Sequence, residues 1–350
     1  MLKENTNLLI GKSGSGKTTG ILLKEMEKLI NNNENILVLD SKEEYYKTYG
    51  KTLKENGYNV YVFNLKEAKK SNGFNPLSLP YYYYKNNESD MMIKLLTDLG
   101  LNIFKSDDPN ADPFWENAAK DYFTGLALTL FKEGNEDEIN LGSIVNMLAK
   151  GTNKNGNGGI FSDYLKSLDP LNTIYIAGSG TEFAPYETKA SILSVMNQKL
   201  NLFLMQEALL NVLNTNELEI NKLNDKCAIF IIGDYDLNNL ANILINQVFA
   251  YIKNTKIKFN FILDNFDTLP RLTSIKEMIN DAGYYNLKLY LAIKDINEME
   301  SIYGKFIFNH MANIINVNGV KDFMEIGSYN EYPMLQKKTF KYFDINKLIK

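Results

Sequence analysis

Short apolar runs alternate with amphipathic stretches in the first part of the chain. Buried strands are indicated at residues 7–10, 36–40 and 58–65, where apolar residues follow one another without a helical period. Residues 18–30 and 43–57 instead carry apolar positions at helical spacing, and a glycine at residue 57 ends the second stretch. This order of strands and helices predicts an α/β fold with a parallel, doubly wound sheet flanked by helices.

The pattern changes after about residue 88. From there to residue 214 the helical period persists and strand runs of the earlier kind are absent from the sequence. The expected helices are residues 89–104, 113–133, 141–148, 160–168 and 186–213. Strand runs return at residues 227–234, 257–264, 287–294 and 313–318, separated by helical stretches at 237–253, 273–281 and 295–303. An all-helical insertion therefore interrupts a sheet that is completed afterwards.

These patterns divide the chain into four parts. We expect residues 1–84 and 216–330 to form the two halves of one α/β domain. Residues 85–215 form the inserted helical domain, and residues 331–350 form a C-terminal tail to which the pattern assigns no element.

Composition narrows the class of protein. A hydrophobic fraction of 45% and a charged fraction of 23% predict a packed globular core, and a net charge of −4 argues against a general nucleic-acid coat. The single cysteine, Cys227, excludes an intramolecular disulfide and is typical of a reducing compartment. No run reaches the ~18 apolar residues that a membrane span needs. We expect a cytoplasmic protein without membrane insertion of its own, peripheral to the inner face of a membrane only through partners.

The candidate chemistry begins at residues 11–18. GKSGSGKT matches G-x-x-x-x-G-K-[ST], with a strand before it and a helix after it. The backbone N–H groups of such a loop surround phosphate oxygens, and the helix N-terminus reinforces the field. We expect Lys17 to contact the β- and γ-phosphates and the Thr18 hydroxyl to bind Mg²⁺. The expected nucleotide contacts are Gly11, Lys12, Ser13, Gly14, Ser15, Gly16, Lys17, Thr18 and Thr19.

ATP is the expected nucleotide. GTPases recognise guanine through N-K-x-D after a strand, whereas the nearest match here, at Asn221, has Asn224 in the fourth position and precedes a strand. The alternative to nucleotide binding is a glycine-rich turn that matches the motif by chance.

A second catalytic feature ends the strand at residues 257–264. Asp264 stands where ligands bind in open α/β sheets, and we expect it to hold Mg²⁺ beside Thr18; a turn-capping role is the alternative. The next residue, Asn265, can orient a water but cannot accept its proton. Losing a general base typically slows a reaction by about 10²–10⁴-fold. Asp40 and Asp234 also end strands and are the candidate substitutes, although structural roles are favoured for both.

Further motifs follow one another in a fixed order. VLDSKEEYY (residues 38–46) has the form V-x-D-P-K-G-E-x-Y with Ser41 in place of the proline and Glu43 in place of the glycine, and GYNVYVFNL and GFNPLSL come after it. The helical part begins with DPFWENAAKDYFTGLALTLF (112–131), and the chain leaves it through KASILSVMNQKLNLF (189–203). The motif AIFIIGDYD (228–236) and the strand that ends at Asp264 follow in this order. Over about residues 8–320 the sequence resembles the cytoplasmic ATPase part of type IV coupling proteins, which link DNA substrates to type IV secretion channels in conjugation.

The resemblance implies a RecA-like P-loop NTPase fold with an inserted all-helical domain. It also implies a ring, usually a hexamer, that binds nucleotide at subunit borders. Single-stranded DNA or a DNA–protein complex would be the substrate, and components of a type IV secretion channel would be partners.

Three positions implied in hydrolysis depart from the family pattern. The family usually has D-E where this chain has Asp264–Asn265, and a glutamine where Lys294 stands. Its arginine before that strand corresponds to Gly283 or a neighbour, and no arginine follows Arg271. An arginine finger contributes ~10³–10⁵ in rate. Retained binding with weakened hydrolysis is therefore expected.

Three hypotheses follow from these residues. The first is a coupling-type ATPase that moves or licenses DNA for secretion, as a homo-oligomer or in a mixed ring. The second is a non-motor subunit of the same fold, gated by nucleotide, with little or no turnover; Asn265 motivates it. The third, a P-loop enzyme such as a small-molecule kinase, leaves the D-P-F-W helix unexplained.

Two aromatic features have alternative interpretations. Residues 81–84, four tyrosines in a row, could stack on the bases of a single strand, but packing between domains is favoured. Trp115 is expected to anchor the core of the helical domain.

Overall fold

The structure, a computed structural model, describes residues 4–106, 108, 110–151, 159–224, 226–233, 237–320 and 323–349. The chain divides into two units. The sheet unit comprises Met1–Asn72 and Ile220–Met334, and the helical unit comprises Gly73–Glu219 and Leu335–Lys350. The first boundary, at residues 72/73, precedes the one predicted at 84/85, because helix α3 (Ser78–Lys85) packs against α4 (Ser89–Phe104).

Seven parallel strands form the sheet of the sheet unit, in the order β3-β4-β2-β5-β6-β1-β7. They are β1 (Thr6–Ile10), β2 (Asn35–Leu39), β3 (Asn59–Asn64), β4 (Cys227–Ile232), β5 (Phe259–Leu263), β6 (Leu287–Ile293) and β7 (Asn313–Asn316). Strands β1, β2, β4 and β5 are buried along their whole length, which explains why their sequences do not alternate. The predicted parallel sheet is confirmed.

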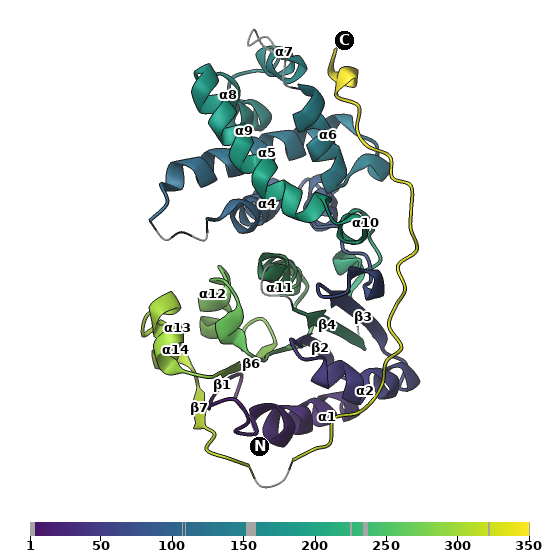
Figure 1. Ribbon diagram of the computed structural model, residues 1–350, viewed down its shortest axis with the longest axis vertical. Helices are drawn as coiled ribbons and strands as arrows, with labels where there is room; N and C mark the ends of the chain where they lie inside the picture. Colours follow the sequence, from purple (N-terminus) through teal and green to yellow (C-terminus); the bar gives the residue numbers. More distant parts are fainter. Residues whose placement is uncertain are drawn as a thin grey trace. The chain divides into compact units, whose positions relative to one another are not determined.

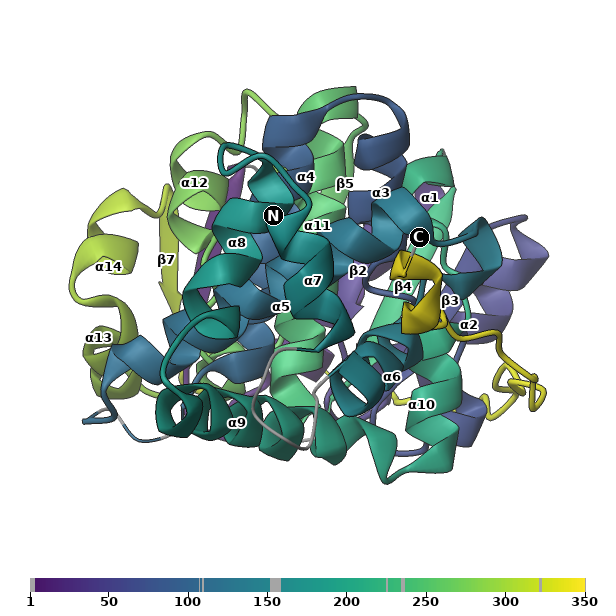
Figure 2. The same ribbon diagram turned by 90° about the horizontal axis from the view of Figure 1, so that it is seen from above.

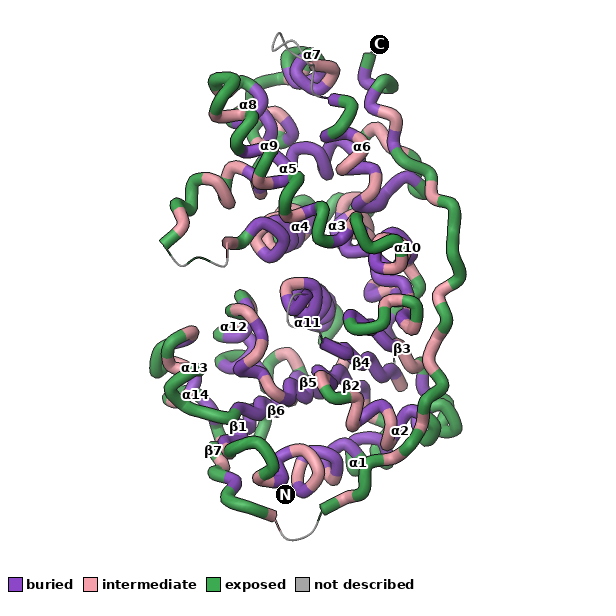
Figure 3. The backbone as a smooth tube through the Cα atoms, in the orientation of Figure 1, coloured by how far each residue is buried: buried purple, intermediate pink, exposed green. Residues whose placement is uncertain are grey.

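Helices cover both faces of this sheet (Figure 1). A wide π-helical turn, Lys17–Leu22, leads into α1 (Leu23–Asn31), and α1 and α2 (Glu44–Glu55) lie on one face. α11 (Asn238–Thr255) and α12 (Ile275–Asn280) lie on the other, and α11 is buried over most of its length (Figure 3). α13 (Ile296–Tyr303) and α14 (Phe306–His310) connect β6 to β7.

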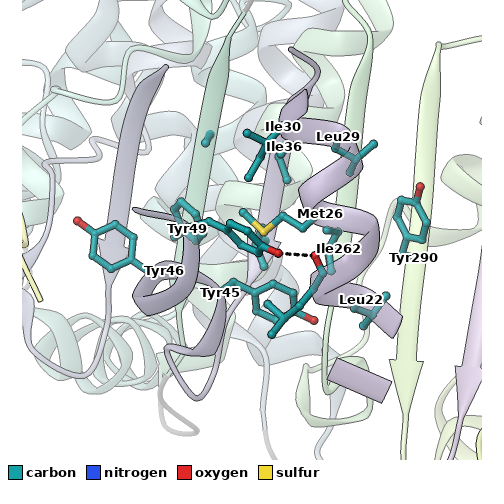
Figure 4. Close-up of a cluster of buried hydrophobic side chains, with 14 of the residues drawn as sticks. Leu22, Met26, Leu29, Ile30, Ile36, Tyr45, Tyr46, Tyr49, Ile262 and Tyr290 are labelled. Atoms are coloured by element: carbon teal, nitrogen blue, oxygen red, sulfur yellow. Dashed lines mark hydrogen bonds between the residues drawn. The ribbon is translucent and has the colours of Figure 1, made fainter. Parts of the chain in front are cut away.

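The core beneath α1 and α2 fixes both helices on the sheet. Met26 and Ile30 of α1 and three tyrosines of α2 pack against strand residues such as Ile36, Ile262 and Tyr290 (Figure 4). Within it, the Tyr49 hydroxyl donates a hydrogen bond of 2.9 Å to the Leu23 carbonyl. Because both helices begin beside the carboxyl ends of strands, this packing determines where their first residues lie.

The helical unit is built around α5 (Pro113–Glu133). Its N-terminus is capped by Asp112, which accepts the Phe114 N–H at 2.9 Å, and proline occupies the first helical position. α4, α8 and α9 pack against it. The remaining helices are α6 (Leu141–Gly151), α7 (Ile160–Lys166), α8 (Thr173–Glu182), α9 (Tyr186–Leu204) and α10 (Glu207–Asn214).

Several helices differ from their sequence predictions. The predicted helix 186–213 is two helices, α9 and α10, separated at Met205–Gln206. α8 is missing from the prediction because its sequence, TIYIAGSGTE, combines glycines with β-branched residues and so has low helix propensity. Its Gly178 lies against Gly125 of α5: a Cβ on Gly125 would come within 2.9 Å of the Gly178 nitrogen. Close packing therefore stabilises a helix that local sequence does not favour.

The aromatic predictions are also corrected. Tyr81 and Tyr84 stack on each other and pack against Phe131, all within the helical unit. Trp115 is only half-buried and touches the exposed ring of Phe114, so it does not anchor the core. Fully buried rings such as Phe123 and Phe161 occupy that core instead.

The C-terminal segment, residues 335–349, belongs to the helical unit. It has an extended conformation that ends in a 3₁₀ turn, Ile345–Leu348, beside α6 and α7 (Figure 2). The Phe343 N–H donates to Ser143 Oγ at 2.9 Å, and Asn146 Nδ2 donates to the Phe343 carbonyl at 2.8 Å. Phe343 and Ile345 are fully buried. Among the helices of the described residues, none combines the length and apolar character of a membrane span.

Candidate functional site

The loop at residues 11–18 leaves the carboxyl end of β1, which lies between β6 and β7 in the sheet. Gly14 and Gly16 have φ of +79° and +94°, a left-handed conformation that glycine adopts without a steric penalty. Gly16 directly precedes the helical turn, and no described side chain caps that turn. The first N–H groups of the turn therefore face the loop without a side-chain partner, as an anion site requires.

Lys17 lies buried inside the loop. Its Nζ donates hydrogen bonds to the carbonyls of Gly11 and Lys12. Burial lowers the pKa of the Lys17 ammonium, while the negative charges of Asp264 and Asp267 oppose that shift. An ammonium that is poorly solvated and bound only to carbonyls is well placed to receive a phosphate.

Thr18 and Asp264 meet although 246 residues separate them in the sequence. The Thr18 hydroxyl donates to Asp264 Oδ2 at 2.5 Å, and the Tyr45 hydroxyl donates to the same oxygen at 3.0 Å. The backbone N–H of Asn265 donates to Asp264 Oδ1 at 2.9 Å. A hydroxyl beside a carboxylate is a hard-oxygen donor set, which suits Mg²⁺. Sequence reasoning missed Tyr45, whose role depends on β2 and β5 being neighbours.

A cavity of about 180 Å³ lies over these groups. Its lining consists of residues 13–19 of the loop together with Lys42, Glu44, Asp264 and Asn265. Asn265 has a φ of 56°, a left-handed conformation that asparagine tolerates better than most residues. Glu44, which sequence reasoning also missed, has a pKa raised by burial; Lys42 opposes the shift and Asp264 adds to it.

Of the two substitute carboxylates proposed from the sequence, the described one, Asp40, does not line this cavity. Asp40 is fully buried, and its oxygens accept the backbone N–H groups of Tyr45 at 3.3 Å and Tyr46 at 2.9 Å. Burial raises the pKa of Asp40 to about 7. It therefore caps α2, the structural role that the sequence favoured. Asp234 lies outside the described residues.

A second cavity, of about 320 Å³, adjoins the first and shares Ser13, Lys42 and Asn265 with it. Lys66 and Lys294 add two further ammonium groups to its lining. The complete lining is Ser13, Ser41, Lys42, Lys66, Gly233, Asn238, Asn265, Thr268 and Lys294. Lys294 directly follows β6, and its N–H donates to Asp267 Oδ2 at 3.0 Å.

The candidate position of an arginine finger lies away from this site. Gly283 precedes β6, and a Cβ there would come within 2.9 Å of the Asn5 side chain, which precedes β1. Because the strands are parallel, Gly283 lies at the amino ends of the strands, whereas the phosphate loop lies at their carboxyl ends. Arg271, the sole arginine of the sequence, is exposed after β5. Among the described residues, no cluster of three or more His, Cys, Asp or Glu side chains could hold a metal ion.

Known proteins resemble this chain in sequence pattern and fold. The family model described as type IV secretory system conjugative DNA transfer matches residues 3–326. No curated protein sequence matches the chain.

Three solved structures illustrate the likeness in fold. The bacterial conjugative coupling protein TrwBdeltaN70 in complex with sulphate has 12% identity and a TM-score of 0.62, and the match covers 90% of this chain and 70% of that one. TrwB in complex with ADP and Mg²⁺ has 12% identity and a TM-score of 0.60, and the match covers 89% of this chain and 70% of that one. VirB4 of Thermoanaerobacter pseudethanolicus has 10% identity and a TM-score of 0.55, and the match covers 91% of this chain and 78% of that one. The expected RecA-like P-loop NTPase fold is confirmed.

Proposed function

Because this chain belongs to the type IV secretory system conjugative DNA transfer family, we propose that it binds ATP and couples ATP binding and hydrolysis to the recruitment or translocation of a DNA substrate to a type IV secretion channel. The proposal rests on one geometric observation. Lys17, Thr18 and Asp264 converge on a single cavity at the carboxyl ends of β1 and β5. The similar structure of TrwB in complex with ADP and Mg²⁺ supports the same choice of ligands.

The loop residues of the cavity and Asp264 have separate tasks toward ATP and Mg²⁺. The N–H groups of residues 13–19 and the Lys17 ammonium bind the phosphate oxygens, and Lys17 exchanges its carbonyl partners for them. The negative charge of the triphosphate raises the pKa of Lys17 again and keeps it protonated. Thr18 and Asp264 hold Mg²⁺, which neutralises the charge that develops on the phosphate oxygens.

The wider assembly is proposed from the family. A homo-oligomeric or mixed ring, with single-stranded DNA or a DNA–protein complex as substrate and channel components as partners, suits a chain without a described membrane span. The absence of an arginine at Gly283 suits a mixed ring, in which another subunit supplies the cation across the border.

A second function is favoured by Asn265. An amide cannot accept the proton of a water, so a subunit that depended on this position for its general base would bind ATP and turn it over at background rate. Such a chain would act as a nucleotide-gated binding or assembly subunit of the ring.

ATP binding and hydrolysis, measured with and without single-stranded DNA, test the proposal. We expect wild type to bind a fluorescent ATP analogue and to hydrolyse ATP faster when DNA is present. Lys17→Ala removes a charged hydrogen-bond donor worth about 1.5–3 kcal/mol, so it should lower affinity by roughly 10- to 100-fold. Lys28→Ala is the control, because Lys28 lies in α1, the helix that follows the turn of Lys17, and among the described residues its ammonium pairs with Glu25.

The outcomes separate the two functions. Full affinity in Lys17→Ala, or no binding by wild type, would remove the basis of both. If wild type binds ATP but does not hydrolyse it, with or without DNA, the non-motor function is supported and the ATPase function is rejected.

A further inference from the structure

The structure offers a carboxylate at the site where Asn265 lacks one. Building on the proposed ATPase function, we propose that Glu44 takes the proton of the attacking water in ATP hydrolysis, the task that Asn265 cannot perform. The inference depends on the position of Glu44, on its freedom from other partners and on the fixed geometry of the helix that carries it.

The sheet register brings Glu44 to the phosphate site. β2 and β5 are neighbours and Leu39 pairs with Leu263, so the residues that follow both strands emerge side by side at one edge of the sheet. Glu44 is the first residue of α2, and Cα–Cβ bonds in a helix tilt toward its N-terminus. Its side chain therefore leans back toward that edge. There it lines the same cavity as Thr18, Asp264 and Asn265.

Among the described carboxylates of this region, Glu44 is the one that has no other structural task. Both oxygens of Asp40 accept backbone N–H groups of α2, and Asp264 accepts two hydroxyls and an N–H group. Asp267 holds the N–H of Lys294, and Glu43 pairs with Lys47 and accepts the Tyr332 hydroxyl. Within the described part of the chain, no hydrogen bond or ion pair engages the Glu44 carboxylate. It is thus available to a water molecule in the cavity.

The first turn of α2 is held rigidly, as a catalytic group requires. Asp40 receives the N–H groups of Tyr45 and Tyr46, the two residues after Glu44. Tyr45 is fully buried and its hydroxyl reaches Asp264. Glu43, with a φ of 64°, makes the tight entry into the helix. The hydrogen bonds that fix Asp264 therefore fix Glu44 relative to it.

The reaction balances with Glu44 as the base. The water oxygen forms a bond to the γ-phosphorus while the bond from that phosphorus to the β,γ-bridging oxygen breaks. Glu44 accepts the water proton and passes it to the departing phosphate, and ADP leaves with the electron pair of the broken bond. A positioned general base accounts for about 10²–10⁴-fold in rate.

Glu44→Gln removes the base and keeps the shape of the side chain. We expect its affinity for a fluorescent ATP analogue to stay within about threefold of wild type, since glutamine cannot take the proton but fills the same space. Its single-turnover hydrolysis should fall by about 10²–10⁴-fold. After incubation with ATP and gel filtration, the variant should retain ATP where wild type retains ADP. Glu55→Gln, at the exposed end of the same helix, should behave as wild type.

Asn265→Glu provides the second arm of the experiment. Introduced into Glu44→Gln, it should restore hydrolysis; introduced into wild type, it should raise hydrolysis by a much smaller factor than in Glu44→Gln, because a base is already present. The comparison of Asn265→Glu with wild type tests the role of Glu44 even if Glu44→Gln fails to fold.

The failure of this inference and the failure of the proposed function look different. Hydrolysis at the wild-type rate by Glu44→Gln, or an increase of about 10²-fold or more on Asn265→Glu in wild type, would overturn the role of Glu44 and leave the ATPase function standing. Loss of ATP binding by wild type itself would instead remove the function on which the role depends.

Discussion

Two aspartates at the ends of neighbouring strands have different roles because their surroundings differ. Asp40 lies at the end of β2, fully buried, and binds two backbone N–H groups of α2. Asp264 lies at the end of β5, where it lines the cavity and binds the hydroxyls of Thr18 and Tyr45. The same side chain is thus a helix cap in one strand and a candidate ion ligand in the next.

Asp40 should make stability depend on pH. The pKa of Asp40 is about 7 in the folded state, above its ordinary value of 3.8. Between pH 3.8 and about 7, the folded state therefore holds a proton that the unfolded state has lost. Its contribution to stability is complete below about pH 4 and is lost as the pH rises through about 7. We expect the free energy of unfolding of wild type, relative to Asp40→Asn, to fall by about 1–4 kcal/mol between pH 4.5 and pH 8.

Urea unfolding of both proteins at several pH values measures this difference. Other titrating groups are common to the two chains and cancel. A difference between wild type and Asp40→Asn that stayed constant over this range would show that Asp40 is ionised throughout.

At the scale of elements, the crossing of α5 and α8 shows packing prevailing over propensity. Gly125 and Gly178 let the two backbones approach closely. A methyl group on Gly125 would meet backbone atoms of α8, which cannot move aside as a flexible side chain can. The exposed Gly180, two residues further along α8, has open space where its Cβ would stand.

Alanine substitutions at these positions should therefore have opposite effects. Gly125→Ala should lower the free energy of unfolding by about 1–3 kcal/mol, because overpacking outweighs the gain in helix propensity. Gly180→Ala should raise it by up to about 1 kcal/mol, because only the propensity changes. Thermal or urea unfolding monitored by circular dichroism compares them. Equal effects of the two substitutions would mean that the close approach carries no energetic weight.

At the scale of the whole molecule, the C-terminal segment completes the helical unit. Residues 335–349 follow the last strand but belong to this unit, and they bring Phe343 and Ile345 into its interior. Asn140 and Asn146 donate hydrogen bonds to backbone carbonyls of the segment at 3.0 and 2.8 Å. The unit thus takes part of its core from the far end of the chain.

Phe343→Ala tests this contribution. Removing a fully buried phenylalanine should cost about 3–5 kcal/mol, enough to release the segment from the helical unit. Limited proteolysis should then cut within residues 335–349 much faster than in wild type, and the thermal midpoint should fall. Lys338→Ala, in an exposed part of the same segment, is the control and should leave both unchanged. Unaltered proteolysis of Phe343→Ala would contradict the docking.

Features held within one continuous stretch were predictable from the sequence. The loop at residues 11–18, its strand and its helix follow from adjacent residues, as does α5, whose Asp112 cap and proline stand next to each other. The parallel sheet was predictable for the same reason, because fully apolar runs separated by helices leave few alternatives. Local hydrogen bonding and periodicity specify these elements before any long-range contact forms.

The neighbours of Asp264 were decided only by the tertiary structure. That β2 lies beside β5 brings the Tyr45 hydroxyl to Asp264 and Glu44 into the same cavity, and no local pattern encodes that adjacency. The sequence by itself determined that this chain has a phosphate loop and a strand ending in one carboxylate. The tertiary structure decided which other carboxylate lines the cavity of Asp264, because the order of strands in a sheet depends on how distant segments pack together.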